Sequence, residues 1–526
     1  MPITSWSALV AAFVPVLLGF VVSRWAHLPA YIARSVTVWS MGLALVAATL
    51  ALVGVLATGP SDQVVGILVL GPAELTFGAY VDRLSVLLLV MVCLIGLVVS
   101  RYSVRYLDGD PGQARFSQWL AFTVSMVLFL LIARNLVLLW TAWVLSSLGL
   151  HKLLTFYGER PAAQFSARKK FIISRLGDLF LLVGFVLTYI ELQTLEILEI
   201  FEQADGLATS ETAPTIAFLF VLGAMTKSAQ FPMHTWLPDT METPTPVSAL
   251  MHAGIINAGG FLLIRLSPVL IQVPAALWFI AAVGAFTAIF ASTVMLTQTD
   301  IKRKLAYSTV GQMGFMMLQI GLGAFAVATM HIVGHSFYKA HAFLSSSSTV
   351  KSTQSQPHDA RPPSFGFQLL LMLFGLVVGT GLVLTGATAS NVGIGHKPGI
   401  LVLGTVLAMA IAQMVVTAQS LSPRKARSTL MALRNGAGLV ILYFILAAGF
   451  QWFLGPSLPD ARPTPMGLAV AILVGFGLVL LLQTMLPVLA QTRFGRHFYV
   501  RAFYGFYIGT RFNRLVERVW PLAPSR

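Results

Sequence analysis

Cysteine and charge are both scarce in this chain. Its 526 residues include one cysteine, Cys93, and only 10% are charged, whereas soluble proteins carry about 25%. One thiol excludes an internal disulfide, a zinc–cysteine site and an iron–sulfur cluster within the chain. Electron transfer through the chain therefore has no support, and we expect Cys93 to be a small core residue. The low charge also leaves no room for a sizeable soluble domain.

Apolar residues make up the rest. They account for 57% of the chain, the mean hydropathy is +0.82, and runs of about 18 apolar residues recur from end to end. We therefore expect an all-α polytopic membrane protein whose first segment is a membrane helix and not a signal peptide. About fifteen spans are predicted, beginning near Leu9, Trp39, Asp82, Phe116, Leu136, Phe171, Thr215, Pro246, Ile271, Leu305, Phe325, Phe367, Ile400, Thr429 and Met466.

The positions of lysine and arginine predict an orientation. Connections after odd-numbered spans, together with the C-terminal tail, hold 25 of the 34 Lys and Arg residues, and connections after even-numbered spans hold four. The positive-inside rule places the basic set in the cytoplasm. We therefore expect a multi-pass protein of the bacterial inner (plasma) membrane, with the N-terminus outside and the C-terminus inside.

The tail from Thr492 to Arg518 mixes six arginines with eight Phe or Tyr residues. This composition predicts an amphipathic helix lying along the cytoplasmic surface. Lipid anchoring and docking of a partner protein are both open. The net charge of +15 does not indicate nucleic-acid binding here, because these arginines flank a membrane span.

Lys227 follows an uninterrupted apolar run and precedes Ser228-Ala229-Gln230-Phe231-Pro232. A lysine at mid-membrane depth costs roughly 3 kcal/mol, and proline breaks the helix that carries it. Such an arrangement is typical of ion and proton sites in membrane proteins. The alternative is snorkelling of the side chain to an interface.

Further polar residues follow the break. His234, Asp239 and Glu242 are candidates for a cytoplasmic mouth, although the two acids could also cap the next helix. His252 lies about two turns into that helix, either on the ion path or as a satisfied core histidine. Asp178 is another membrane carboxylate, which either pairs with Arg175 or belongs to the path.

A second cluster is His331, His335 and Lys339, whose i, i+4, i+8 spacing puts them on one helix face. A proton relay or a hydrogen-bonded packing face suits this pattern. Metal binding is disfavoured, because HIVGH lacks the inner Glu of HExxH and Lys339 would repel a cation. Beyond Asp300 the only acids are Asp359, Asp460 and Glu517, so we place any charge relay in the first eleven spans.

Three segments carry a resemblance: KSAQFPMHTWLPDTMETPTPVSALMHAG, TQTDIKRKLAYSTVGQMGFMML and MHIVGHSFYKAHAFL. From about Asp82 to Leu344 the chain resembles the antiporter-like membrane subunits of complex I and the Mrp antiporters. The resemblance implies inverted five-helix repeats, each with a broken helix and a central lysine. By this resemblance Lys227 is the lysine of the seventh, broken span, His252, His331, His335 and Lys339 lie on the polar axis, and Asp178 is a family aspartate.

That resemblance implies five parts. They are N-terminal transmembrane helices (1–115), a first antiporter-like repeat (116–266), a second, eroded repeat (267–419), C-terminal transmembrane helices (420–489) and a basic amphipathic tail (490–526).

Two departures from the family pattern stand out. Val144 occupies the position of a family glutamate in the fifth span, and the second repeat lacks the lysine or glutamate of a second broken helix. Lys397 is the nearest candidate there, and we expect it in a loop. His151, Lys152, Asp178 and Glu242 are candidates to interact with Lys227, and Lys304 is a further undecided path residue.

These departures favour a shortened relative, and the chain resembles the DabB membrane subunits of DAB inorganic-carbon complexes. The resemblance implies that a proton or sodium gradient drives conversion of CO2 to bicarbonate by a DabA-like cytoplasmic zinc partner. The zinc would then lie in the partner, and we expect this chain to be a transporter subunit without a cofactor or metal of its own. Two alternatives are a cation/proton antiporter or complex I subunit, and a membrane scaffold with a vestigial channel.

Overall fold

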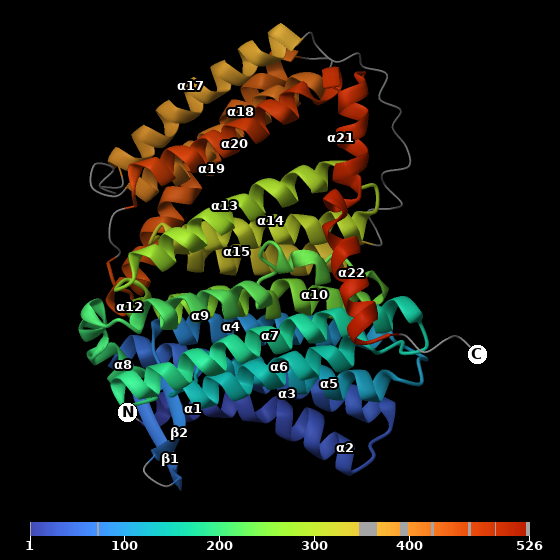
Figure 1. Cartoon of the computed structure of the whole chain (residues 1–526). Coiled ribbons are helices and arrows are strands. Elements are labelled where there is room, and N and C mark those ends of the chain that lie inside the picture. Colours follow the sequence, from blue (N-terminus) through green and yellow to red (C-terminus); the bar gives the residue numbers. More distant parts are fainter. Residues whose placement is uncertain are drawn as a thin grey trace.

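Long helices lying roughly parallel to one another make up most of the computed structural model (Figure 1). It describes residues 2–70, 73–346, 365–389, 398–421, 425–460, 464–489 and 491–521. The N-terminal helices are α1 (Pro2–Val14), η1 (Pro15–Val22), α2 (Ser23–Trp25), α3 (Ala30–Thr58) and α4 (Arg83–Tyr106).

The helices that follow hold the first group of polar residues. They are α5 (Gln113–Leu131), α6 (Leu136–Leu154), α7 (Pro161–Leu192), α8 (Ile197–Glu202), η2 (Ala204–Thr209), α9 (Ala213–Lys227), η3 (Met233–Trp236), η4 (Thr240–Glu242), α10 (Thr245–Ala253), η5 (Ile255–Asn257) and α11 (Ala258–Arg265).

The remaining helices form a middle group and a last group. The middle group is α12 (Ser267–Leu270), α13 (Pro274–Thr297), α14 (Ile301–Gly321) and α15 (Phe325–Leu344). The last group is α17 (Phe365–Ala389), α18 (Pro398–Leu421), α19 (Lys425–Leu454), η6 (Gly455–Ser457), α20 (Met466–Leu489), α21 (Arg493–Phe503), η7 (Gly505–Tyr507) and α22 (Ile508–Val519).

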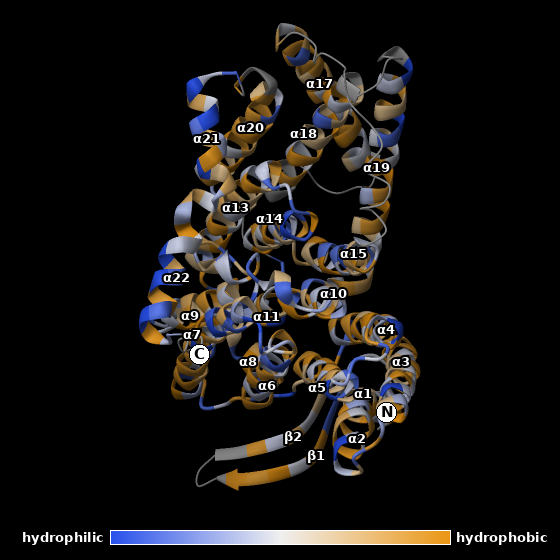
Figure 2. Cartoon of the chain, turned by 90° about the vertical axis from the view of Figure 1, so that its right-hand side faces the viewer, coloured by the Kyte–Doolittle hydropathy of each residue, from blue (hydrophilic) through white to orange (hydrophobic). Residues whose placement is uncertain are grey.

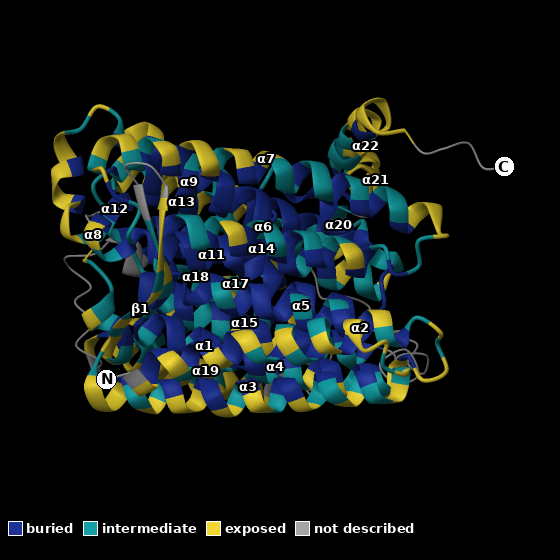
Figure 3. Cartoon of the chain, turned by 90° about the horizontal axis from the view of Figure 1, so that it is seen from below, coloured by how far each residue is buried: buried dark blue, intermediate teal, exposed yellow. Residues whose placement is uncertain are grey.

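The membrane character of the fold is clear from helix length and composition. Eleven of the described helices are long and apolar enough to cross a membrane, and two shorter apolar helices span Ala213–Lys227 and Val402–Ala418. Hydrophobic residues predominate along the long helices (Figure 2). Buried residues gather toward the centre of the helix bundle, and exposed residues lie at its edges (Figure 3). The number of about fifteen spans stays a prediction. Helices α14 and α15 are neither among the eleven long apolar helices nor among the two shorter ones.

The expectation of an all-α chain is wrong in one place. Strands β1 (Ser61–Leu70) and β2 (Ala73–Val81) form an antiparallel hairpin that pairs Ser61 with Val81. The segment has the β-branched residues that suit strands, and Gly71-Pro72 between the strands is a turn signal. The sequence therefore carried a hairpin signal that the membrane-helix interpretation passed over.

Glycine lets two of the middle helices come unusually close. A Cβ atom at Gly284 of α13 would lie 2.5 Å from the Leu318 nitrogen of α14, and one at Gly314 would lie 2.6 Å from the Ala288 nitrogen. Small residues at such contacts allow close packing of membrane helices. This packing fixes α14, whose polar side chains contact the histidines and Lys339 described below.

The tail is helical, as predicted. Helices α21 and α22 run across the ends of the other helices (Figure 1). The Gln298 amide of the α13–α14 connection donates to the Phe503 carbonyl, and Arg168 of α7 donates to the Pro521 carbonyl. The tail therefore lies on the same face as the α13–α14 connection and the start of α7. We call this face the tail face.

Candidate ion path

Lys227 is the last residue of α9, so the helix breaks where the proline predicts. Its side chain is buried, and Nζ donates to the Trp143 carbonyl (2.9 Å) and to Ser146 Oγ (3.0 Å) of α6. The amine also lies 4.3 Å from the centroid of the Trp143 ring, in cation–π range. Because the Lys227 amine is bound by groups within the protein, its side chain does not extend to a membrane interface, and the snorkelling alternative is disfavoured.

Two more lysines, which sequence reasoning had assigned to a basic connection, lie inside α7. Lys169 and Lys170 are buried, because α7 begins as early as Pro161. Lys170 Nζ donates to the Ser147 carbonyl (2.8 Å) and to Ser147 Oγ (2.5 Å). The neighbouring residues Ser146 and Ser147 of α6 thus each bind one buried amine. The pair of serines within the apolar segment LSSLGL was the sequence signal for these binding positions.

The candidates named for contact with Lys227 make their direct contacts elsewhere, although the Asp178 carboxylate also interacts electrostatically with Lys227. Asp178 pairs with Arg175 at 2.7 Å, as one of the two alternatives predicted. Lys152 is exposed and lies 5.9 Å from the Trp119 ring, and His151 packs edge-on against Phe171. Val144, at the family glutamate position, is half-buried against the core.

The predicted mouth residues separate into two ion pairs and one buried ring. Asp239 accepts from Lys169 Nζ at 2.7 Å, and the same amine donates to Asn513 Oδ1 of α22 at 2.8 Å. Glu242 pairs with Arg160 at 3.1 Å on the surface. The capping alternative is wrong, because neither acid makes a side-chain cap to η4 or α10.

His234 is the buried ring among the mouth candidates. It stacks on Phe231 and meets Phe290 edge-on, with ring centroids 5.7 and 5.0 Å away. In the sequence, His234 lies just beyond the break, between Lys227 at the end of α9 and Asp239 of the ion pair with Lys169.

A second break, which was not predicted, lies in the next span. Helix α10 ends at Ala253, one residue after His252, and α11 begins at Ala258. The two breaks touch, since Ser228 Oγ donates to the Ile256 carbonyl at 2.7 Å and a Cβ on Gly259 would lie 2.5 Å from the Ala224 carbonyl oxygen. Gly254, Asn257 and Gly259 were the sequence signals for this interruption.

His331, His335 and Lys339 do share one face of α15, and that face meets α14. His331 Nδ1 is 2.9 Å from Gln319 Oε1, and His335 Nδ1 is 2.5 Å from Gln312 Oε1. Lys339 Nζ donates to Ser308 Oγ at 2.9 Å. Each of these three basic side chains thus faces a neutral oxygen atom of α14.

His252 joins the first group of helices to this face. Its Nδ1 lies 3.0 Å from Thr309 Oγ1 of α14, and its ring stacks on Phe343 of α15 at 4.3 Å. From the break beside it, Asn257 Nδ2 donates to Ser336 Oγ at 2.8 Å. Polar contacts therefore continue from the two breaks to α15.

Several buried atoms along this line have no hydrogen-bond partner within the described part of the chain. They are His252 Nε2, Asn257 Oδ1 and His335 Nε2. Buried polar atoms are normally paired, so each marks a point where a water molecule or a moving proton fits.

Of the last two candidates, Lys304 is exposed near the start of α14, away from this line. Lys397 lies outside the described residues. Across the described ranges, no group of three or more His, Cys, Asp or Glu residues has the arrangement of a metal site.

Comparisons with known proteins agree with the geometry. The family described as "NADH:quinone oxidoreductase/Mrp antiporter, TM" matches residues 133–422, and "NADH-Ubiquinone oxidoreductase (complex I), chain 5 N-terminus" matches residues 68–117. "Probable inorganic carbon transporter subunit DabB2" of Halothiobacillus neapolitanus is 38% identical over 86% of this chain and 82% of its own length. The chain is a DabB-type member of the antiporter-like family.

Other relatives support the same assignment. "Probable inorganic carbon transporter subunit DabB" of Hydrogenovibrio crunogenus is 33% identical over 84% of this chain and 83% of its own. Among solved structures, the Mrp complex from Dietzia sp. contains a chain with a TM-score of 0.59 and 23% identity. That match covers 97% of this DabB-type chain and 56% of the Mrp chain. The latter comparison establishes the fold alone.

Proposed function

We propose that this DabB-type chain is the ion-translocating membrane subunit of an inorganic-carbon uptake complex. A proton or sodium ion moving inward along the polar line drives conversion of CO2 to bicarbonate in a zinc-bearing cytoplasmic partner. A zinc-bound hydroxide is a suitable nucleophile toward CO2, and that chemistry is assigned to the partner. The chain itself is a transporter subunit and not an enzyme.

The observation that carries the proposal is the row of buried amines that bind neutral oxygen atoms. Lys227, Lys170 and Lys339 each donate to serine hydroxyls. A fixed carboxylate partner would hold an ammonium group in its charged form, whereas a serine leaves it free to exchange a proton. Basic groups at successive positions within a membrane protein are typical of proton relays.

The extent of similarity favours carbon uptake over a respiratory role. Two relatives named as carbon transporter subunits align over 84–86% of this chain, and a third, DabB1 of Halothiobacillus neapolitanus, aligns over 54% of it. "NAD(P)H-quinone oxidoreductase chain 5" of Synechocystis is 40% identical but aligns over 53% of it.

Further parts of the proposal concern architecture. We assign the chain two antiporter-like inverted repeats within the five parts given above, and place the tail face in the cytoplasm of a bacterium. The tail face carries the basic connections, and the Lys169–Asp239 pair is the cytoplasmic mouth. A DabA-like partner binds there, against the arginines of α21 and α22.

The decisive experiment replaces Lys227 with alanine in a host that lacks carbonic anhydrase, with the partner co-expressed. We expect Lys227→Ala to abolish growth in ambient CO2 while the complex still assembles. Lys302→Ala, at a partly buried position in the first turn of α14, is the matched control and should support normal growth. Undiminished growth of the Lys227 variant would sink the proposal.

Two other functions give different outcomes. An antiporter or complex I subunit would co-purify with Mrp or quinone-reductase subunits in place of a zinc protein. A membrane scaffold would recruit its partner and support growth even when His252 and Lys339 are both replaced by alanine.

A further inference from the structure

Two cavities lie beyond the basic face of α15, in the part of the protein where the family charge is missing. The inner cavity, about 480 Å³, lies between α13, α14 and α15 and is lined by Gln312, His331 and His335. The outer cavity, about 730 Å³, lies between α13, α18, α19 and α20. The inner cavity reaches the amine row at Ser308, which binds Lys339, whereas the outer cavity lies away from Lys227 and Lys170.

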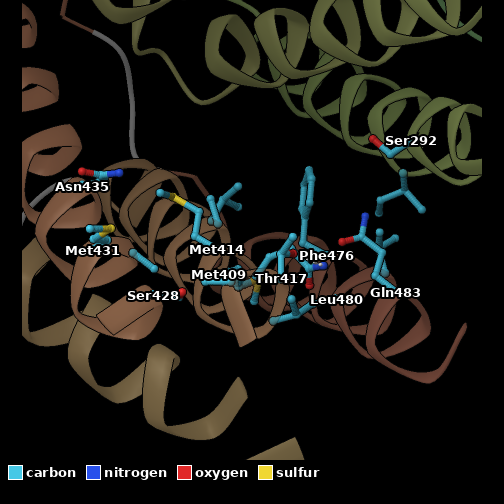
Figure 4. A pocket seen from close by; sticks show the side chains of 17 residues that line it. Ser292, Met409, Met414, Thr417, Ser428, Met431, Asn435, Phe476, Leu480 and Gln483 are labelled. Atoms are coloured by element: carbon cyan, nitrogen blue, oxygen red, sulfur yellow. Dashed lines mark hydrogen bonds between the residues drawn. The ribbon is translucent and has the colours of Figure 1, made fainter. Parts of the chain in front are cut away.

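The two cavities meet at one boundary. Ser292 of α13 and Phe476 of α20 line both of them. Phe476 and Gln483 point from α20 toward the helix that carries Ser292 (Figure 4). The Phe476 ring also packs edge-on against Phe315, which contacts His331. Phe476 therefore lies at the boundary of the two cavities, and Phe315 lies between it and His331.

The outer cavity is lined by polar side chains that carry no charge. Gln413, Gln483 and Asn435 supply amides, and Thr417 supplies a hydroxyl, among methionines and aliphatic residues. Gln413 Oε1 is buried without a hydrogen-bond partner among the described residues, as His335 Nε2 is in the inner cavity. Each cavity is far larger than a water molecule, and polar atoms in need of partners favour water within them.

The outer cavity extends toward one end of the helices. Its lining includes Thr417 near the end of α18, Ser428 near the start of α19 and Gln483 near the end of α20. Helix α20 leads directly into α21 of the tail, so these ends lie toward the tail face. The inner cavity extends from the histidines to Met295 in the last turn of α13.

We propose that the two cavities form one uncharged, water-filled half-channel that connects His331 and His335 with the tail face. Water held by amides and hydroxyls takes the place of the missing lysine or glutamate of the second repeat. Phe476 forms its apolar constriction, where gating by local dewetting is possible. The identity of the moving ion rests on the proposed function, whereas the hydration and the side of opening do not.

Cysteine accessibility tests this directly, because Cys93 is the only native thiol and is buried. In the full-length chain with Cys93→Ala, single cysteines replace Gln483, Gln413 and Ser292. A charged, membrane-impermeant methanethiosulfonate is applied to right-side-out and to inverted vesicles. Arg514→Cys, exposed on α22, reports which preparation presents the tail face.

We expect all three cavity cysteines to react from the side on which Arg514→Cys reacts, with Ser292→Cys the slowest. Phe476→Ala should accelerate labelling at Ser292→Cys several-fold and leave Gln483→Cys unchanged. Val474→Cys, on an exposed position of α20, is the lipid-facing control and should react only with a lipophilic maleimide. Maleimide labelling after denaturation gives the total protein in every sample.

Three outcomes would overturn the half-channel. Reaction of the cavity cysteines with the lipophilic reagent alone means that acyl chains fill the space. Reaction with neither reagent means that the space is closed, and reaction from the opposite side means that the direction is wrong. Labelling as expected, together with normal growth of Lys227→Ala, would retain the half-channel and reject the proposed function.

Discussion

The two halves of the membrane region handle polarity in opposite ways. In the α10–α11 span, the whole apolar window is buried within the protein, whereas in α17, α19 and α20 the buried share is 28%, 22% and 17%. The densely packed half buries lysines and binds them through serine and carbonyl oxygens. The loosely packed half contains amides and hydroxyls around a cavity.

The difference teaches that loss of a family charge is not loss of polarity. A buried ammonium needs fixed partners, because leaving it unpaired in an apolar interior costs several kcal/mol. Amides tolerate looser surroundings, since water satisfies them. The second half is therefore better described as a change from charged groups to hydrated neutral groups than as erosion.

The strongest test of this difference between the two halves is to introduce a charged side chain into the neutral half. Gln413→Lys introduces an amine that costs roughly 3 kcal/mol at mid-membrane depth and repels a passing cation. We expect uptake of labelled inorganic carbon to fall by at least about tenfold. Gln413→Asn, which keeps the amide, should retain most of the activity, and equal loss in both variants would contradict the comparison.

Removing a charge from the dense half should have the next largest effect. Lys170→Met keeps the length of the side chain but deletes the amine that binds Ser147. We expect about a tenfold loss of uptake, less than the roughly 10²–10⁴-fold that a positioned acid–base group contributes, because Lys227 and Lys339 remain in the row. Lys152→Met, on an exposed neighbour, is the control, and normal uptake by the Lys170 variant would remove that residue from the path.

Restoring the family glutamate sharpens the comparison further. In Val144→Glu a carboxylate is placed next to Trp143, whose carbonyl binds Lys227. A nearby opposite charge favours the protonated amine, so we expect uptake to slow several-fold and its optimum to move to higher pH. Val144→Gln is the neutral control, and a faster Glu variant would show that the serine environment is not what this chain requires.

The smallest expected effect is at the tail. Asn513→Ala removes one hydrogen bond from Lys169, a change of about 1 kcal/mol and so a few-fold loss of uptake at most. Asn513→Asp should retain the contact with the amine. An effect as large as that of Lys170→Met would mean that α22 belongs to the path itself.

Much of the fold could be predicted because hydropathy and proline act locally. The break after Lys227 follows from Pro232, and the face of α15 follows from helical spacing. The hairpin was missed because an apolar strand and an apolar helix look alike in composition. The second break was missed because glycine within a membrane helix is common.

Most basic residues of the candidate site could be predicted from the sequence, whereas buried Lys170 and the partners of the amines could not. Lys227, His335 and Lys339 are conspicuous because charge is rare in apolar segments. Their partners Ser146, Gln312 and Ser308 are ordinary residues, and only the packing of α6 and α14 brings them within hydrogen-bond distance. The cavity around Gln413 depends on four separate helices and leaves no local signature.

The contact between Asn513 and Lys169 links an event on the surface to one in the interior. Lys169 binds Asp239 and α22 through the same nitrogen. Any molecule that holds α22 in a different position therefore changes how tightly Lys169 keeps its proton or its acid. Because such linkage is reciprocal, each change of occupancy at the mouth must alter the affinity with which the tail is held.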